Sequence, residues 1–149
     1  MAAPFVFKTY QVTGTPETVR HNLDELLRTS GLAGTGTGES TLYYRYPSFT
    51  FSSKRPLSCL SRLAVSFSRE GEDVSIRVGA TFTKIRYYTI AVFTLVCVVL
   101  PALISYYERG APTIPPPSYL GLPLGVMVHY HVRWRAFHAI RQLIHQAGG

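Results

Sequence analysis

Alternating apolar and polar positions mark the early part of the chain as a folded domain with a β-sheet. The alternation runs over residues 62–68 and again over 74–82, on either side of a polar turn at 70–73. A period of two is typical of strands with one buried face, so this stretch predicts a β-hairpin. Two further strands are predicted over residues 5–12 and 41–46 from their aromatic and β-branched content.

One amphipathic helix is predicted between the first two of these strands. Val19, Leu23, Leu26 and Leu27 fall at i, i+4, i+7 and i+8, the spacing of a single helical face. Pro16 suits the first helical position, and Gly31 is expected to end the helix. A helix with one apolar stripe and a sheet with one apolar face bury each other. The sequence therefore predicts an α+β fold, a small two-layer β-α-β-β-β polar domain over residues 1–86.

The glycine-rich stretch at residues 34–40 resembles a phosphate-binding loop only superficially. Such a loop needs a Gly-Lys-Ser/Thr ending and a following helix. Here a strand-like run follows at residues 41–46. We therefore expect this stretch to be a flexible connector.

Two long uncharged runs, at residues 87–107 and 111–132, dominate the rest of the chain. The first contains 21 residues. At a rise of about 1.5 Å per residue it would reach about 31 Å, close to the ~30 Å hydrocarbon thickness of a bilayer. Pairs of tyrosines at both ends would form an interfacial belt. We predict a transmembrane helix over residues 87–107, kinked at Pro101 unless a neighbouring group replaces the lost hydrogen bond.

A second transmembrane helix is predicted over residues 119–134, after a Pro-rich external loop at residues 108–118. Gly121 and Gly125 offer small residues for close helix packing. Residues 135–149 are predicted to continue as an amphipathic basic juxtamembrane helical tail, which lies along the lipid headgroups or docks under the polar domain. The apolar stripe of this extension would consist of Trp134, Phe137, Ile140 and Ile144.

Composition and charge agree with a membrane protein. Apolar residues make up 46% of the chain and charged residues only 15%, against about a quarter charged in a soluble domain. The formal net charge of +7 would raise nucleic acid as a partner of a soluble protein. Here membrane topology explains much of that charge, and no nucleic-acid partner is expected.

Basic residues flank the two uncharged runs on one side only. The connecting loop has Arg109 alone, offset by Glu108. The positive-inside rule therefore places both termini on the cytoplasmic side, or in the equivalent compartment, of a two-pass integral membrane protein. Contacts with anionic lipid headgroups are predicted for Lys84, Arg86, Arg133, Arg135 and Arg141.

Candidate chemistry is sparse. The eight carboxylates fall on predicted exposed faces, turns or loops, and no acid and base are paired. Neither uncharged run contains Asp, Glu, Lys or Arg, which argues against an ion or proton pathway. Cys59 and Cys97 are expected to be free thiols, because a bridge would join different environments. We therefore expect no enzyme activity, no catalytic residues, no metal site and no small-molecule substrate.

Histidines provide the one sharp alternative. His129 or His131 could ligate haem iron or the magnesium of a chlorophyll-type pigment, although no cofactor is the main expectation. Two residues apart on a helix, they point about 200° away from each other and cannot share one metal. His131, His138 and His145 recur every seven residues, about 10 Å apart, which is too far for one ion.

Three functions are compatible with these patterns. The leading expectation is a non-catalytic accessory or assembly subunit of a larger integral-membrane complex, because the domain is small and the helices carry packing features. The second is a pigment- or haem-binding membrane subunit that uses a histidine of the second helix. The third is a membrane-anchored regulator whose basic cytoplasmic domain binds lipid, protein or nucleic acid. No motif is specific enough to indicate a family.

Overall fold

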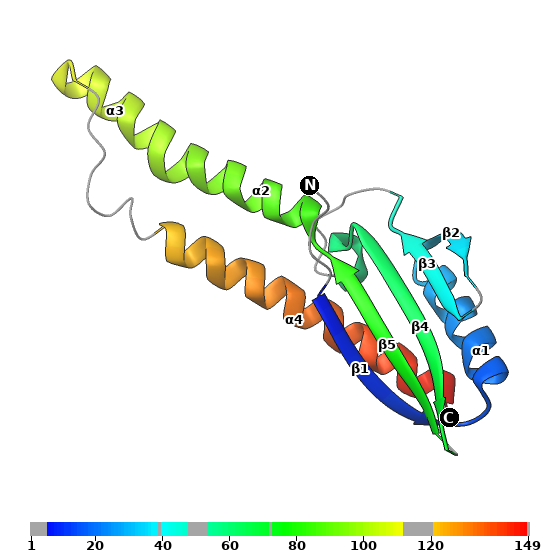
Figure 1. Ribbon diagram of the computed structural model, residues 1–149. Helices are drawn as coiled ribbons and strands as arrows, with labels where there is room; N and C mark the ends of the chain where they lie inside the picture. Colours follow the sequence, from blue (N-terminus) through cyan, green and yellow to red (C-terminus); the bar gives the residue numbers. More distant parts are fainter. Residues whose placement is uncertain (1–5, 39, 48–53, 72, 112–120, 149) are drawn as a thin grey trace. The chain divides into compact units, whose positions relative to one another are not determined.

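The chain forms two compact units in the computed structural model, which describes residues 6–38, 40–47, 54–71, 73–111 and 121–148 (Figure 1). The first unit joins Met1–Lys84 with Trp134–Gly149, and the second is Ile85–Arg133. Three predicted features lie outside the described residues, at least in part. They are the first residue of the strand at 5–12, the Pro-rich loop from residue 112 onward, and the first two residues of the second membrane helix.

A five-stranded antiparallel sheet organises the first unit, which is a mixed α+β domain as predicted. Its strands lie in the order β1-β5-β4-β3-β2. The predicted hairpin is confirmed, because Glu70 pairs with Asp73 and Gly71 adopts a φ of +70° in the tight turn. The strands are β1 (Val6–Thr13), β2 (Ala33–Thr37), β3 (Thr41–Arg45), β4 (Arg62–Glu70) and β5 (Asp73–Thr81).

Strand β2 lies in the stretch that was predicted to be a flexible connector, so that prediction is wrong. It also adds one strand to the predicted β-α-β-β-β order. It pairs antiparallel with β3, from Ala33 opposite Arg45 to Thr37 opposite Leu42, with an irregularity between Gly34 and Gly36. All five of its residues are exposed at the edge of the sheet. With no buried face and two glycines it shows no apolar alternation, which is why the sequence pattern did not indicate a strand.

Helix α1 (Pro16–Thr29) begins and ends where the sequence predicts. Gly31 has a φ of +90°, its N–H donates to the carbonyl of Arg28, and the N–H of Leu32 donates to the carbonyl of Leu27. These two bonds form a Schellman motif, in which the left-handed residue is normally glycine. The buried face of α1 consists of Val19, Leu23 and Leu27.

Two helices cover one face of the sheet (Figure 1). One is α1, and the other is the part of α4 (Gly121–Gly148) that belongs to the first unit, Trp134–Gly148, which we call the C-terminal segment. The ring of Phe137 lies 5.8 Å from that of Phe82. The amide of Asn22 on α1 donates to the carbonyl of Ala147 at 3.2 Å. The segment buries Ala136, Phe137, Ile140, Ile144 and Ala147.

The C-terminal segment is thus part of the domain core. The sequence left two positions open for this segment, along the lipid headgroups or docked under the polar domain. In the structure the segment packs against the polar domain. Trp134 departs from the predicted apolar stripe, because it is 62% exposed while Ile140 and Ile144 are buried.

A continuous helix of 27 residues, Thr83–Arg109, begins at the end of the first unit's N-terminal part and otherwise belongs to the second unit. It consists of α2 (Thr83–Thr94), a π-helical turn η2 (Leu95–Val99) and α3 (Leu100–Arg109). In the π turn, the N–H of Leu100 donates to the carbonyl of Leu95, five residues back. Pro101 follows directly and has no N–H, so the wider turn accommodates the hydrogen bond that proline removes.

Within the described residues, Thr83–Arg109 is the one helix long and apolar enough to cross a membrane, and its most apolar stretch contains no buried residue. A clear two-helix transmembrane hairpin, as the sequence predicts, is therefore not found. The described part of the second predicted span belongs to α4, which continues past residue 134 to Gly148. Residues 112–120 lie outside the description.

Candidate functional site

The predicted packing glycines lie where α4 contacts the apolar helix inside the second unit. A Cβ atom on Gly121 would collide with Sγ of Cys97, and one on Gly125 would lie 3.1 Å from Cδ2 of Phe93. Such distances leave no room for a larger side chain. Phe93 and Cys97 belong to a less exposed stripe with a spacing of four residues, which also includes Thr89, Pro101 and Ser105.

The candidate cofactor ligands lie on different sides of α4. His129 is half-buried and His131 is exposed, as their spacing requires. Among the residues that the structure describes, no three His, Cys, Asp or Glu side chains are placed to hold a metal ion.

The five basic residues predicted to contact headgroups have different surroundings. Nζ of Lys84 donates to the carbonyl of Tyr46 at 3.4 Å, and the guanidinium of Arg133 lies 5.5 Å from the centre of the Tyr130 ring. The other three are Arg86 and Arg141, which are exposed, and Arg135, which is half-buried. Lipid contact by these residues stays a prediction.

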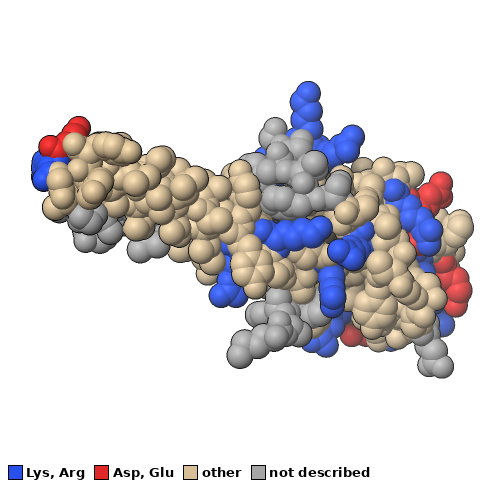
Figure 2. Space-filling view, turned by 90° about the horizontal axis from the view of Figure 1, so that it is seen from above, with Lys and Arg blue, Asp and Glu red and all other residues tan. Residues whose placement is uncertain are grey.

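Charge is distributed unevenly over the two units (Figure 2). Figure 2 shows many basic side chains over the first unit, and a long uncharged surface that ends at the charges of α3; residues 87–107 of α2, η2 and α3 carry no charge. These end charges are Glu108 and Arg109. The polar unit therefore carries nearly all groups that could bind a charged ligand.

A groove of about 330 Å³ opens between β1 and the C-terminal segment, both in the first unit. Among the described residues that line it, none is acidic and several are basic or aromatic. We call it the basic groove. It is lined by Lys8, Tyr10, Gln11, Trp134, Phe137, His138, Arg141 and His145.

Helical spacing positions the α4 side of the basic groove. The Trp134 and His138 rings are stacked, with centres 5.5 Å apart and planes 16° apart. Nε of Arg141 donates to Nε2 of His145 at 3.4 Å. Both pairs are four residues apart, the spacing that puts side chains on the same face of a helix.

The β1 side adds a cation and a phenol. Lys8 and Tyr10 alternate with outward-facing residues, so both point to the face that the helices cover. Nζ of Lys8 lies 5.0 Å from the centre of the Phe137 ring. Burial raises the pKa of Tyr10, although the positive charge of Arg141 opposes this effect. Tyr10 therefore stays protonated at neutral pH and can donate a hydrogen bond into the groove.

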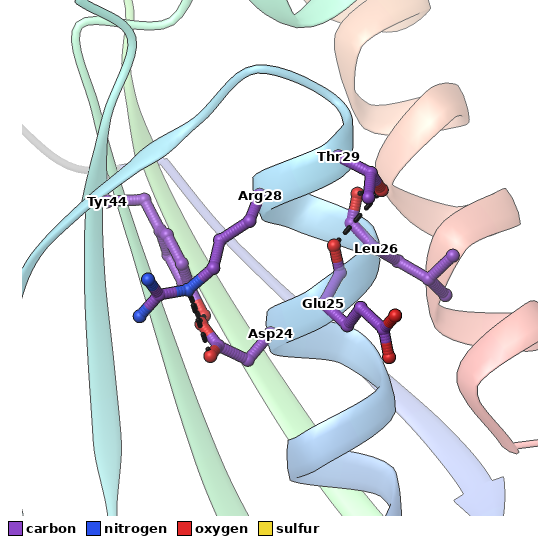
Figure 3. Close-up of polar contacts among 6 residues, drawn as sticks. All are labelled: Asp24, Glu25, Leu26, Arg28, Thr29 and Tyr44. Carbon is purple, nitrogen blue, oxygen red and sulfur yellow. Dashed lines mark hydrogen bonds and ion pairs between the residues drawn. The ribbon is translucent and has the colours of Figure 1, made fainter.

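A separate polar network links α1 to β3 (Figure 3). The Tyr44 hydroxyl donates to Oδ1 of Asp24 at 2.5 Å, and Nε of Arg28 donates to the same carboxylate at 3.0 Å. Partial burial raises the pKa of Asp24, but these two hydrogen bonds outweigh it and the net pKa is lowered. Tyr44 is 1% exposed, so the network satisfies a hydroxyl in the core and is structural.

The second hollow of the first unit, about 450 Å³, lies between the end of α1, the short helix η1 (Pro56–Cys59) and the C-terminal segment. Cys59, the last residue of η1, is buried, and its thiol donates to the carbonyl of Pro56. Burial raises the pKa of Cys59 to about 11. Both cysteines are free, as predicted.

No family model matches the chain, and neither a curated protein sequence nor a solved structure is similar enough to count as a match.

Sequence reasoning missed the basic groove, because its two sides lie at opposite ends of the chain. The seven-residue repeat of His138 and His145 was the available signal. Their spacing is too wide for one shared metal ion, and in the structure both histidines line the basic groove beside Arg141.

Proposed function

We propose that this chain is a two-pass membrane protein with both termini on the cytoplasmic side, and that it is a non-catalytic accessory or assembly subunit of a larger integral-membrane complex. The proposed topology rests on one observation: the first unit is formed by two segments of the chain that lie before and after the second unit. Residues before and after the second unit share one hydrophobic core. A segment that enters the bilayer from this unit has to return to the same side, which requires an even number of crossings.

The helix Thr83–Arg109 supplies one crossing. The return crossing is assigned to the second predicted span, residues 119–134, whose described part belongs to α4. Exposed apolar side chains of α4 favour this assignment, since Leu124, Val126 and Met127 are each more than half exposed. Basic residues at the two ends of the second unit favour the cytoplasmic orientation of the termini.

The uncovered face of the sheet favours a protein partner. One row of paired residues crosses this face from Tyr43 through Ala64 and Gly79 to Phe7. The two aromatic rings at its ends are 46% and 52% exposed, while the residues between them are small. Three strand spacings separate the ends by about 14 Å, and an α-helix is about 10 Å wide. Aromatic and arginine side chains are enriched in interfaces, and the guanidinium of Arg77 lies 4.5 Å from the Phe7 ring.

Topology is tested with single-cysteine variants in a background that lacks both natural cysteines. A membrane-impermeant maleimide applied to intact cells should label Gly110→Cys and should leave Gln146→Cys unlabelled until the cells are opened. Labelling of both positions in intact cells would contradict a cytoplasmic C-terminal segment. Labelling of neither would contradict the external loop.

The accessory role is tested by extraction in mild detergent, native mass spectrometry and an absorption spectrum of the same sample. We expect a colourless assembly larger than the 16.6 kDa chain. A photo-crosslinking residue at Tyr43 should reach a partner subunit, whereas one at exposed Gln142 on α4 serves as the control. A monomer or homo-oligomer without cross-links would reject the proposal. A visible absorption band lost in His129→Ala would favour the pigment or haem alternative.

A further inference from the structure

We propose that the basic groove binds a phosphate-bearing anion, and that its natural source is the headgroup of an anionic phospholipid. The lipid source rests on the proposed membrane location. The phosphate site itself rests only on the first unit, because all residues that line the groove belong to it.

The position of Lys8 is the first argument. Lys8 pairs with Val78, which in turn pairs with Val65, so the lysine occupies the face of the sheet that is otherwise apolar and covered by helices. Lys8 is nevertheless exposed, so its ammonium group is accessible to a ligand in the groove. The contact that the structure gives it is the face of the Phe137 ring.

Convergence of like charge is the second argument. Arg141 approaches the same groove from α4, and His138 and His145 flank it. Neither Lys8 nor Arg141 forms an ion pair with any residue that the structure describes. Both cations are exposed, and an anion bound between them would offset their mutual repulsion.

The available donors fit a phosphate better than a single negative charge. Lys8 is a compact point charge, Arg141 presents a planar fork of N–H donors, and Tyr10 adds a hydroxyl. Several donors from different directions match the three or four oxygens of a phosphate group. Gln11 also lines the groove, and its amide donates to Glu70 at 3.4 Å.

The place of Trp134 favours a lipid as the source of that phosphate. Trp134 follows Arg133 directly after the second uncharged run, and it is 62% exposed. Tryptophan at the end of a membrane helix is typical of the headgroup region. The groove therefore begins with an interfacial residue and continues with cations.

The test uses the full-length protein in detergent and the fluorescence of Trp134, which is the only tryptophan of the chain. Three probes are compared: dioctanoyl phosphatidic acid, dioctanoyl phosphatidylcholine and glycerol phosphate. We expect saturable binding of phosphatidic acid, much weaker binding of the zwitterionic lipid and weak binding of glycerol phosphate. Native mass spectrometry should show one retained phosphatidic acid.

Variants locate the site. Lys8→Gln and Arg141→Gln should each weaken binding about tenfold, the loss expected for one charge-assisted hydrogen bond. Arg141→Lys should lose less, because it keeps the charge. Arg62→Gln is the matched control, since it removes an exposed positive charge from the same unit away from the groove. Unchanged protection of Cys59 against alkylation shows that each variant is folded.

Three results would overturn the proposal. Equal losses in Arg62→Gln and Arg141→Gln would mean attraction to net charge and not a site. If none of the three probes bound saturably, there would be no phosphate site. Equal affinity for glycerol phosphate would replace the lipid source with a soluble phosphate ester. A wrong topology with intact phosphate binding would instead reject the proposed membrane orientation alone.

Discussion

The burial of Ile144 makes the docking of the C-terminal segment measurable. Its side chain is 0% exposed, against the core of the first unit. Ile144→Ala removes three carbon atoms from a closed environment, for which losses of about 2–5 kcal/mol are usual. We expect the free energy of unfolding of the first unit to fall by about 3 kcal/mol. Ile144→Val should cost about 1 kcal/mol, which keeps the series interpretable if the alanine variant does not fold.

Hydrogen–deuterium exchange of the full chain in detergent provides the assay. Amides in the middle of β5 pair on both sides, with β1 and β4, so they exchange only when the unit opens. A loss of about 3 kcal/mol corresponds to a roughly 150-fold faster exchange at these amides. Amides of α3 in the second unit should be unaffected.

Gln146→Ala is the control, because it changes an exposed side chain on the same segment. Its effect should stay within about 0.5 kcal/mol. If Ile144→Ala changed β5 exchange no more than Gln146→Ala does, the segment would not be part of the core. That result would favour the alternative position along the lipid headgroups and would remove the basis for an even number of crossings.

Four further predictions concern the polar network, the thiols and the glycines. Tyr44→Phe should destabilise the first unit by about 1 kcal/mol in urea unfolding. The folded-state pKa of Asp24 is lowered, so its stabilisation is present above about pH 4 and is lost as the pH falls through that lower value, and Asp24→Asn should flatten this acid loss. Cys59, with its pKa raised to about 11, should resist alkylation at pH 8 until the unit unfolds, which a pulse-labelling series in urea measures. Gly121→Leu should separate the packed helices and speed the labelling of Cys97 by a membrane-permeable maleimide, whereas Ala91→Leu on an exposed position should not.

Secondary-structure elements with a clear pattern in their own stretch of sequence were predicted correctly. Helix α1 has a periodic apolar stripe, a proline at its start and a glycine at its end, and the β4–β5 hairpin has strict alternation around a glycine turn. Each of these signals depends on neighbours in the chain, so the sequence alone reveals it.

Two features that leave no local pattern of side chains were not predicted. The glycine-rich strand β2 exists because β3 offers an edge with which it can pair, and pairing of backbone groups leaves no mark on side-chain pattern. The basic groove needs Lys8 and Arg141 on opposite walls, a placement that follows from the packing of the C-terminal segment. Neither residue is unusual within its own stretch of sequence.

The first unit is built from two separate parts of the chain, and this links its folding to the second unit between them. The sheet is complete at Thr81, but one apolar face is then covered only by α1. The remaining cover, which includes Phe137, Ile140 and Ile144, comes after the whole second unit in the chain. If the second unit crosses the bilayer and returns, the core can close only after both crossings are made. A domain of this size is only marginally stable without its full cover, so under the proposed topology completion of the core depends on correct insertion.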